Sequence, residues 1–317
     1  AGRPLATRPA WAAWPAPAPA NASAPSAPGL LKAAPAAPPR DTRQESDLLE
    51  EIKPGANCCD ELTGKVRLVS LGCYCGPKLS FQQIGRGAET LPFDWMRTRI
   101  EGLLHFLRSG FAGFFDFVTQ RPVPGAAGMV MYRGYLHSFW HDNPTDPAMH
   151  EKYLRRIRRL QSMRADQDPV LFVRSVASTD ELPRLPELLA ELAARFGRLA
   201  RLLVIVDFQS SPRGPWLVEG HPSLLLYYFC RSCHDTSRMG PYEDPVRCGL
   251  EWAVGRQVGA GTFPSMQAAC HAVQPTHFGY GGLGGLEAFE AAPGGQLAAQ
   301  LAASEAAAAA QQPPAPV

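Results

Sequence analysis

The stretch VLFVRSVASTDELPRLPELLAELAARFGRLARLLVIVD, residues 170–207, contains two apolar runs with an amphipathic segment between them. Residues 170–173 and 202–206 are short and fully apolar, which predicts two strands that are buried on both faces. Residues 185–196 carry leucines at helical spacing and are followed by Gly197, so they are predicted to form an amphipathic helix. Two apolar strands with a helix between them are typical of parallel strands joined by a crossover.

The same alternation continues toward the N-terminus. Residues 66–71 predict another buried strand, which ends in a glycine, and residues 79–84 suit a short helix. Residues 100–107 and 149–160 each place apolar side chains on one helical face, with arginines around the second of these faces. The aromatic run at residues 111–117 is predicted to be core. The predicted fold class is therefore α/β, with a parallel or mixed sheet flanked by helices in a single core domain.

Both ends of the chain differ from this centre. Residues 1–64 begin with an Ala- and Pro-rich stretch, and residues 281–317 are rich in Gly, Ala and Pro. Such segments bury too little apolar surface to offset the entropy of ordering, so we predict a disordered leader and a tail. The leader is also compatible with a transit peptide, since its first part has no acidic residue. Residues 65–280 remain as the core domain.

Composition excludes several classes of function. The chain has 317 residues with 31 basic and 29 acidic side chains, a net charge of +2, which argues against a nucleic-acid-binding protein. No run approaches the roughly 18 apolar residues that a membrane span needs. Eight cysteines, two of them adjacent, do not suggest a secreted disulfide framework in a domain of this size, so an intracellular protein is favoured. The oligomeric state is left open.

The most informative short motif is Ser70-Leu71-Gly72-Cys73-Tyr74-Cys75. Here a predicted strand ends in a glycine turn, and a cysteine begins a predicted helix. The free amides and the positive end of the helix dipole would stabilise a thiolate, and the same amides could hold a developing oxyanion.

A nucleophilic thiol needs a base, and residues 135–142 offer two histidines, His137 and His141. Catalytic pairs commonly lie far apart in sequence and meet only in the fold. The residues alone also support a simpler interpretation, because buried cysteines and structural histidines are common. In that case the chain is a non-catalytic α/β binding module.

Several motifs together resemble a domain-of-unknown-function family that is catalogued as putative papain-like cysteine peptidases. The resemblance covers roughly residues 66–208. It rests on Ser70-Leu71-Gly72 with Cys75, on Pro92-Phe93-Asp94-Trp95, on His141-Asp142, on residues 153–157 with Leu160, on Leu171-Phe172-Val173-Arg174, and on the strand that ends at Asp207.

The resemblance implies a thiol hydrolase or transferase that acts on a peptide or another amide or ester and needs no cofactor. It assigns Cys75 as the nucleophile and His141 as the base. The carboxylate that orients the imidazole would be Asp207 or Asp94, and Asp142 is a third candidate. The family's fold would be papain-like α+β, an alternative to the α/β class.

The sequence departs from the family's pattern at two positions, because Cys73 is an addition and Tyr74 replaces a small amide residue. Backbone amides are then the remaining oxyanion donors, and Cys73 is a secondary or resolving thiol.

A separate cluster of cysteines lies nearer the C-terminus. Cys230-Arg231-Ser232-Cys233-His234 matches a haem-attachment motif, but nothing around it suggests a cytochrome. A zinc site is the stronger alternative, and it would stabilise the binding module. Its ligands would be Cys230, Cys233, Cys248 and either Cys270 or His271.

Overall fold

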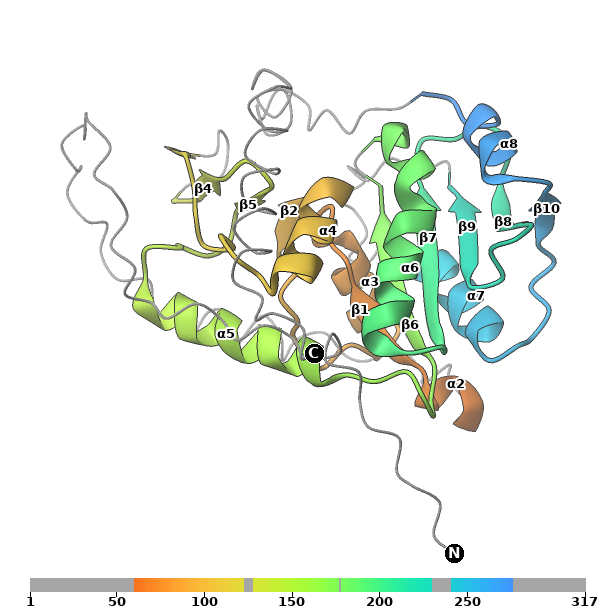
Figure 1. The fold of residues 1–317 in the computed structure, drawn as a ribbon, viewed down its shortest axis with the longest axis horizontal. Coiled ribbons are helices and arrows are strands. Elements are labelled where there is room, and N and C mark those ends of the chain that lie inside the picture. The colour runs from red at the N-terminus through yellow and green to blue at the C-terminus, as the bar shows by residue number, and fades with distance from the viewer. Residues whose placement is uncertain (1–59, 123–127, 177, 230–240, 276–317) are drawn as a thin grey trace, which may run out of the picture.

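The computed structural model describes residues 60–122, 128–176, 178–229 and 241–275 (Figure 1). These residues form a mixed α/β core domain with a mainly parallel sheet A and a smaller antiparallel sheet B. The α/β class predicted from the alternating strands and helices is confirmed. The papain-like α+β alternative is not what the structure shows, since the crossovers β1-to-β6 and β6-to-β7 make the central strands parallel.

Sheet A has the strand order β1-β6-β7-β9-β8-β10. Its first four strands are parallel, β8 runs antiparallel to β9, and β10 is parallel to β8. The carboxyl ends of β1, β6 and β7 therefore meet at one edge of the sheet. The bounds are β1 (Arg67–Ser70), β6 (Val170–Ser175), β7 (Ala200–Val206), β8 (Gly214–Val218), β9 (Leu224–Tyr228) and β10 (Gly261–Phe263).

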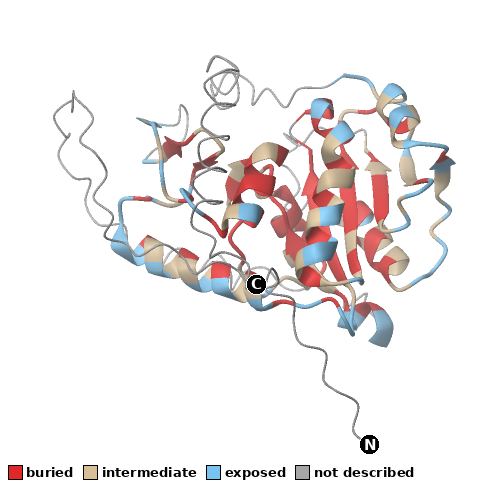
Figure 2. Cartoon of the chain, in the orientation of Figure 1, coloured by how far each residue is buried: buried red, intermediate tan, exposed pale blue. Residues whose placement is uncertain are grey.

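Helices cover both faces of sheet A. Leu171 and Val173 of β6 pack into the cluster that includes α3 (Gly76–Gln83) and α7 (Glu243–Ala253). Val170 and Phe172 pack into the cluster on the other face. This alternation explains why the central strands are apolar throughout. The second face is covered by α4 (Ile100–Ser109), the 3₁₀ helix η2 (Thr179–Arg184), α6 (Leu185–Phe196) and α8 (Met266–His271) (Figures 1 and 2).

The strands of sheet B lie between β1 and β6 in the sequence, and their order in the sheet is β2-β5-β4-β3. Its strands are short, and the ring of Tyr153 on α5 packs against Phe139 of β5. The bounds of these elements, with the short N-terminal helix α2, are α2 (Glu61–Lys65), β2 (Met96–Thr98), β3 (Thr119–Pro122), β4 (Val130–Arg133), β5 (His137–Phe139) and α5 (Pro147–Ser162).

The predicted helices and strands of sheet A are found with small shifts at their ends. α4 ends at Gly110, which adopts the left-handed conformation (φ 66°) that glycine accommodates best. The aromatic run at 111–117 contributes Phe111 and Phe114 to the core, as predicted. The strands of sheet B and the β8–β9 hairpin were not predicted, because none combines length with a clear alternation of polar and apolar residues.

The described core continues in the sequence beyond residues 66–208, the segment that carries the motifs. The buried Gln209 side chain, just after β7, donates to the Gln274 carbonyl and accepts from the Gln274 amide, so residue 274 is held at the sheet. The predicted leader and tail lie outside the described residues, and the boundaries 1–64, 65–280 and 281–317 stay predictions. None of the described helices has the length and apolar character needed to cross a bilayer.

Candidate functional site

Residues 71–75, here called the cysteine turn, connect β1 to α3. Gly72 and Cys73 both have left-handed backbones, with φ of 73° and 69°. A Cβ on Gly72 would lie 3.1 Å from Thr98 Oγ1 and 3.3 Å from the Phe93 carbonyl oxygen. Gly72 thus satisfies both a left-handed backbone and a close approach to residues 93–98. Cys75 is the N-cap residue of α3, as the sequence predicts.

Cys75 lies where backbone amides and one cation are close at hand. The amides in the first turn of a helix lack acceptors within the helix. In α3 these are the amides of Gly76 and Lys78, because Pro77 between them has no N–H group. Burial raises the pKa of the half-buried Cys75 thiol, and the positive charge of Arg97 on β2 opposes that shift. The resting thiol is therefore protonated at neutral pH and needs a base to become a nucleophile.

Arg97 was missed by sequence reasoning, because a single arginine in a three-residue strand carries no signal. Its guanidinium carbon lies 3.5 Å from the centroid of the Trp140 ring. The Trp140 indole in turn donates to Ser138 Oγ at 2.9 Å. Arg97 is thus held at a defined position beside the cysteine turn.

His141 approaches the cysteine turn through sheet B. β2 pairs with β5, and residue 141 follows two residues after β5 ends. The exposed His141 ring makes an edge contact with the Trp95 ring, with centroids 5.9 Å apart. Residues 93–98 thus approach Gly72 of the cysteine turn, and the same segment contacts His141 through Trp95.

His137, the other histidine of this segment, is buried in the aromatic core. Its ring lies 5.0 Å from the Phe106 ring and stacks on the Phe114 ring at 5.6 Å. Burial lowers the pKa of His137 to about 3, with a smaller contribution from His105. A buried imidazole that resists protonation cannot serve as the base for a thiol at the turn.

The buried state of His137 predicts acid sensitivity. In the unfolded chain its pKa is the ordinary 6.5, so the unfolded state gains a proton below that pH while the folded state does not. We expect the free energy of unfolding to fall by about 2 kcal/mol because of His137 when the pH is lowered from 6.5 to 5. His137→Phe should remove that loss, which urea unfolding at both pH values would measure. An unchanged difference between the two pH values would contradict this assignment.

Two of the three candidate carboxylates have structural partners. Asp94 is buried, forms an ion pair with Lys78 of α3 at 3.1 Å and accepts from the Leu91 amide. Asp142 accepts from the Tyr153 hydroxyl at 2.8 Å and from Lys152. Both carboxylates thus fix loops of sheet B to neighbouring helices.

Asp207, the third candidate, follows β7 at the carboxyl edge of sheet A. One of its oxygens accepts from the Phe208 amide, and the other accepts from the Tyr242 hydroxyl at 2.9 Å. That hydroxyl also lies 2.9 Å from the Tyr74 hydroxyl and 3.1 Å from Ser175 Oγ. Burial raises the pKa of Asp207 to about 6, against the opposing effect of these donors. Asp207 is therefore linked to the cysteine turn through two tyrosines.

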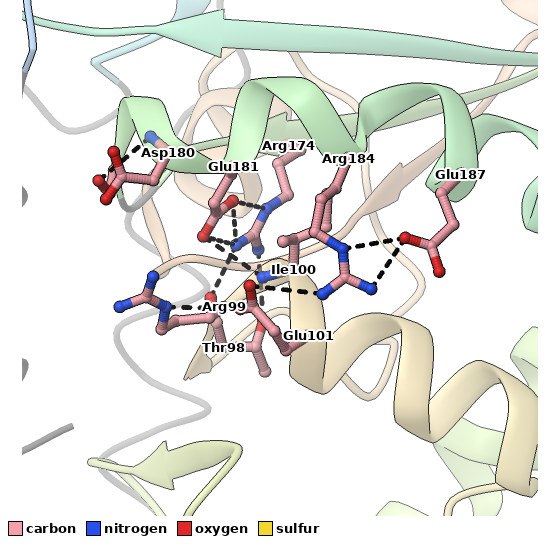
Figure 3. A network of polar contacts seen from close by, with 10 residues as sticks. Thr98, Arg99, Ile100, Glu101, Arg174, Asp180, Glu181, Arg184 and Glu187 are labelled. Atoms are coloured by element: carbon pink, nitrogen blue, oxygen red, sulfur yellow. Dashed lines mark hydrogen bonds and ion pairs between the residues drawn. The ribbon is translucent and has the colours of Figure 1, made fainter. Parts of the chain in front are cut away.

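A buried ion pair between Arg174 and Glu181 lies in a network of polar contacts that includes Thr98 and Ile100 (Figure 3). Arg174, at the end of β6, donates to both carboxylate oxygens of Glu181 and to the carbonyl oxygens of Leu71 and Thr98, at 2.7–2.9 Å. Glu181 also accepts from the Ile100 amide at the N-terminus of α4. Arg174 and Glu181 thereby join the turn, β2 and α4. A charged residue inside an apolar strand was the available sequence signal for this pair.

Two of the predicted zinc ligands that the structure describes, Cys248 and Cys270, lie apart. Cys248 packs into the cluster on the α7 face of sheet A, whereas Cys270 packs into the cluster on the opposite face. One ion cannot bind both thiols across the sheet. Cys230 and Cys233, with the haem-attachment motif, lie outside the described residues. Within those residues, no group of three or more His, Cys, Asp or Glu side chains could hold a metal.

Comparison with known proteins adds two findings. Residues 66–209, a little under half of the chain, match the family model described as "Putative papain-like cysteine peptidase (DUF1796)". "Uncharacterized protein R408" of Acanthamoeba polyphaga mimivirus is 26% identical over 143 residues, covering 37% of this chain and 64% of that protein. The match thus spans less than two thirds of that relative. No solved structure gives a significant match. Residues 66–209, from just before β1 to just after β7, are therefore the part of the chain that is similar to the family of that description.

Proposed function

We propose that the protein is a cysteine-dependent hydrolase that cleaves an amide or ester, with Cys75 as the nucleophile and His141 as the base. The observation that carries the proposal is the position of Cys75. It caps α3 at the carboxyl edge of a parallel sheet and lies near Arg97 of β2, the strand that pairs with β5, which ends two residues before His141. Sites of α/β proteins commonly lie at that edge. The family description, which names a papain-like cysteine peptidase, supports the same class of reaction.

The chemistry follows from the groups around the thiol. His141 accepts the thiol proton as the Cys75 sulfur bonds to the substrate carbonyl carbon, which leaves an oxyanion. The amides at the start of α3 stabilise that oxyanion, and Arg97 adds a positive charge nearby. The leaving amine or alcohol departs with a proton, and water then cleaves the thioester to release the acid and the thiol.

The base function is assigned to His141 because His137 is buried and remains neutral. Asp94 and Asp207 have partners other than an imidazole in the described contacts, Lys78 and Tyr242 respectively. The proposal therefore uses a Cys75–His141 pair. An orienting carboxylate is not needed for the first step, because the pair alone can transfer the proton.

The class of reaction can be tested on the full chain with three substrates: a fluorogenic peptide amide, a thioester and an aryl ester. We expect hydrolysis of at least one of them, and we expect iodoacetamide to remove that activity in parallel with alkylation of Cys75. If Cys75 is alkylated and hydrolysis continues, Cys75 is not the nucleophile and the proposal is wrong. If none of the three is cleaved, the chain is better described as a non-catalytic α/β binding module. The raised pKa of the Cys75 thiol is the observation that favours this second candidate.

A further inference from the structure

The Tyr242 hydroxyl is the centre of a small network at the carboxyl edge of sheet A. A hydroxyl has one proton to donate and two lone pairs that accept. When Asp207 is ionised, Tyr242 must donate to it, so the hydrogen bonds from Tyr74 and Ser175 are ones that Tyr242 accepts. The Tyr242 backbone amide also donates to Ser80 Oγ of α3 at 2.9 Å, which holds the tyrosine in place.

The four side chains of this network differ in their access to solvent. Ser175 and Tyr242 are fully buried and Asp207 is 2% exposed, whereas Tyr74 is only half-buried. Within the described network, the hydrogen bonds that lead from Asp207 to a partly exposed side chain run through Tyr242 to Tyr74. Tyr74 directly precedes Cys75 in the cysteine turn.

The position of Tyr74 depends on a glycine. A Cβ on Gly76 would lie 2.3 Å from both Cζ and Oη of Tyr74, which is closer than real contacts allow. Gly76 is the first residue of α3, where a glycine is not needed for the backbone conformation. Its lack of a side chain instead lets the Tyr74 ring fold back and bring its hydroxyl to Tyr242.

We propose that Tyr74, Tyr242 and Asp207 form a proton relay for the Cys75 site, in which Tyr74 gives the leaving group its proton and Asp207 stores that proton. This inference rests on the proposed function and deepens it by assigning the acid. In this relay Tyr74 is the catalytic residue, because it directly precedes Cys75 and is the member assigned to contact the leaving group. Tyr242 and Asp207 act through it as positioning residues.

The proton transfers balance over one turnover. In acylation, the thiol proton goes to His141 and the S–C bond forms. As the C–N or C–O bond breaks, the leaving group takes the proton of Tyr74, which takes one from Tyr242, which takes one from Asp207. In deacylation, water supplies its oxygen to the acyl carbon and a proton returns along the relay to Asp207. The imidazolium of His141 then reprotonates the Cys75 thiolate.

The relay requires a protonated Asp207 at the start of each turnover. Burial raises the pKa of Asp207 to about 6. Among the described residues, the titratable groups hydrogen-bonded to it are Tyr242 at the N-terminus of α7 and, through that hydroxyl, Tyr74 of the turn, while β6 contributes the neutral Ser175. We therefore expect amide hydrolysis to fall as the pH rises above about 6.

The test compares two leaving groups in the full chain and its variants. A peptide amide needs a proton on its nitrogen to depart, whereas a p-nitrophenyl ester releases a stable anion. Tyr74→Phe and Asp207→Asn should each slow amide hydrolysis by about a hundredfold and leave ester hydrolysis within about twofold. Both variants should also lose the fall in amide rate above pH 6. Ser175→Ala is the matched control, since Ser175 also hydrogen-bonds to the Tyr242 hydroxyl but is not part of the relay. We expect this variant to keep the rates of both amide and ester hydrolysis.

Three outcomes would count against the relay. If Tyr74→Phe leaves amide hydrolysis unchanged, the proton comes from elsewhere and the relay is wrong. If it slows both substrates equally, Tyr74 only shapes the site, and the relay is also overturned. If the unmodified chain cleaves neither substrate, the proposed function itself fails, and the relay fails with it.

Discussion

Replacement of Cys75 by alanine is expected to lower hydrolysis by at least about a thousandfold. In the proposed reaction the thiol supplies the electron pair that attacks the substrate carbonyl carbon, and alanine has no atom that can form this covalent intermediate. The loss should appear in kcat, because alanine removes the reacting atom without changing how the substrate is held. Steady-state kinetics on the substrate class that the full chain cleaves would measure it.

Cys73→Ala is the matched control for this prediction. Cys73 lies two residues away, is buried at 1% exposure and has a left-handed backbone, so its replacement perturbs the same turn. We expect Cys73→Ala to retain most of the activity, and His141→Ala to lose about a hundredfold or more. Equal losses from Cys73→Ala and Cys75→Ala would show that the turn is sensitive to any change and would remove the assignment of Cys75 as nucleophile.

Arg174→Met is expected to lower the free energy of unfolding by about 3–5 kcal/mol. Arg174 and Glu181 are both fully buried, so removal of the guanidinium leaves an unpaired carboxylate in the core and leaves the Leu71 and Thr98 carbonyl oxygens without their donor. Urea unfolding of the full chain, read as the shift in midpoint at constant slope, would measure the effect.

The double variant Arg174→Met/Glu181→Leu distinguishes the cost of the unpaired Glu181 carboxylate from the loss of the other Arg174 hydrogen bonds. Apolar replacement of both partners removes the buried charge, so the double variant should be more stable than Arg174→Met alone. We expect both variants to have reduced activity, because in each the Leu71 carbonyl at the start of the cysteine turn lacks the Arg174 donor. A cost below about 1 kcal/mol for Arg174→Met would contradict the described burial of the ion pair.

The sequence predicted three strands of sheet A, β1, β6 and β7, because these strands are largely apolar and buried on both faces. Residues 170–173 and 202–206 have helices on each face, which leaves a strong signal in the sequence itself. Sheet B has three- and four-residue strands, and its outer strand β3 is largely exposed. Strands this short are specified by their partners in the fold, so local sequence cannot reveal them.

The candidate site divides in the same way. Cys75 at the start of a helix was readable from a strand, a glycine and a cysteine in series. The roles of Arg97 and Tyr242 were not, because each depends on a contact between distant segments: Arg97 reaches the cysteine turn from β2, and Tyr242 reaches Asp207 from α7. Asp94 was a reasonable candidate by residue type, but its buried ion pair with Lys78 becomes visible only in three dimensions.

The most direct test of Cys75 as the nucleophile is to locate the acyl group on the enzyme. The full chain would be mixed with an aryl ester, quenched in acid and digested with trypsin, which releases the peptide LVSLGCYCGPK of residues 68–78. That peptide contains both Cys73 and Cys75, so fragmentation must assign the acyl mass to one of them. Catalysis by Cys75 predicts a thioester on Cys75 that disappears as turnover ends. An acyl group on Cys73, Cys248 or Cys270 instead, or hydrolysis without any acylated cysteine, would contradict it.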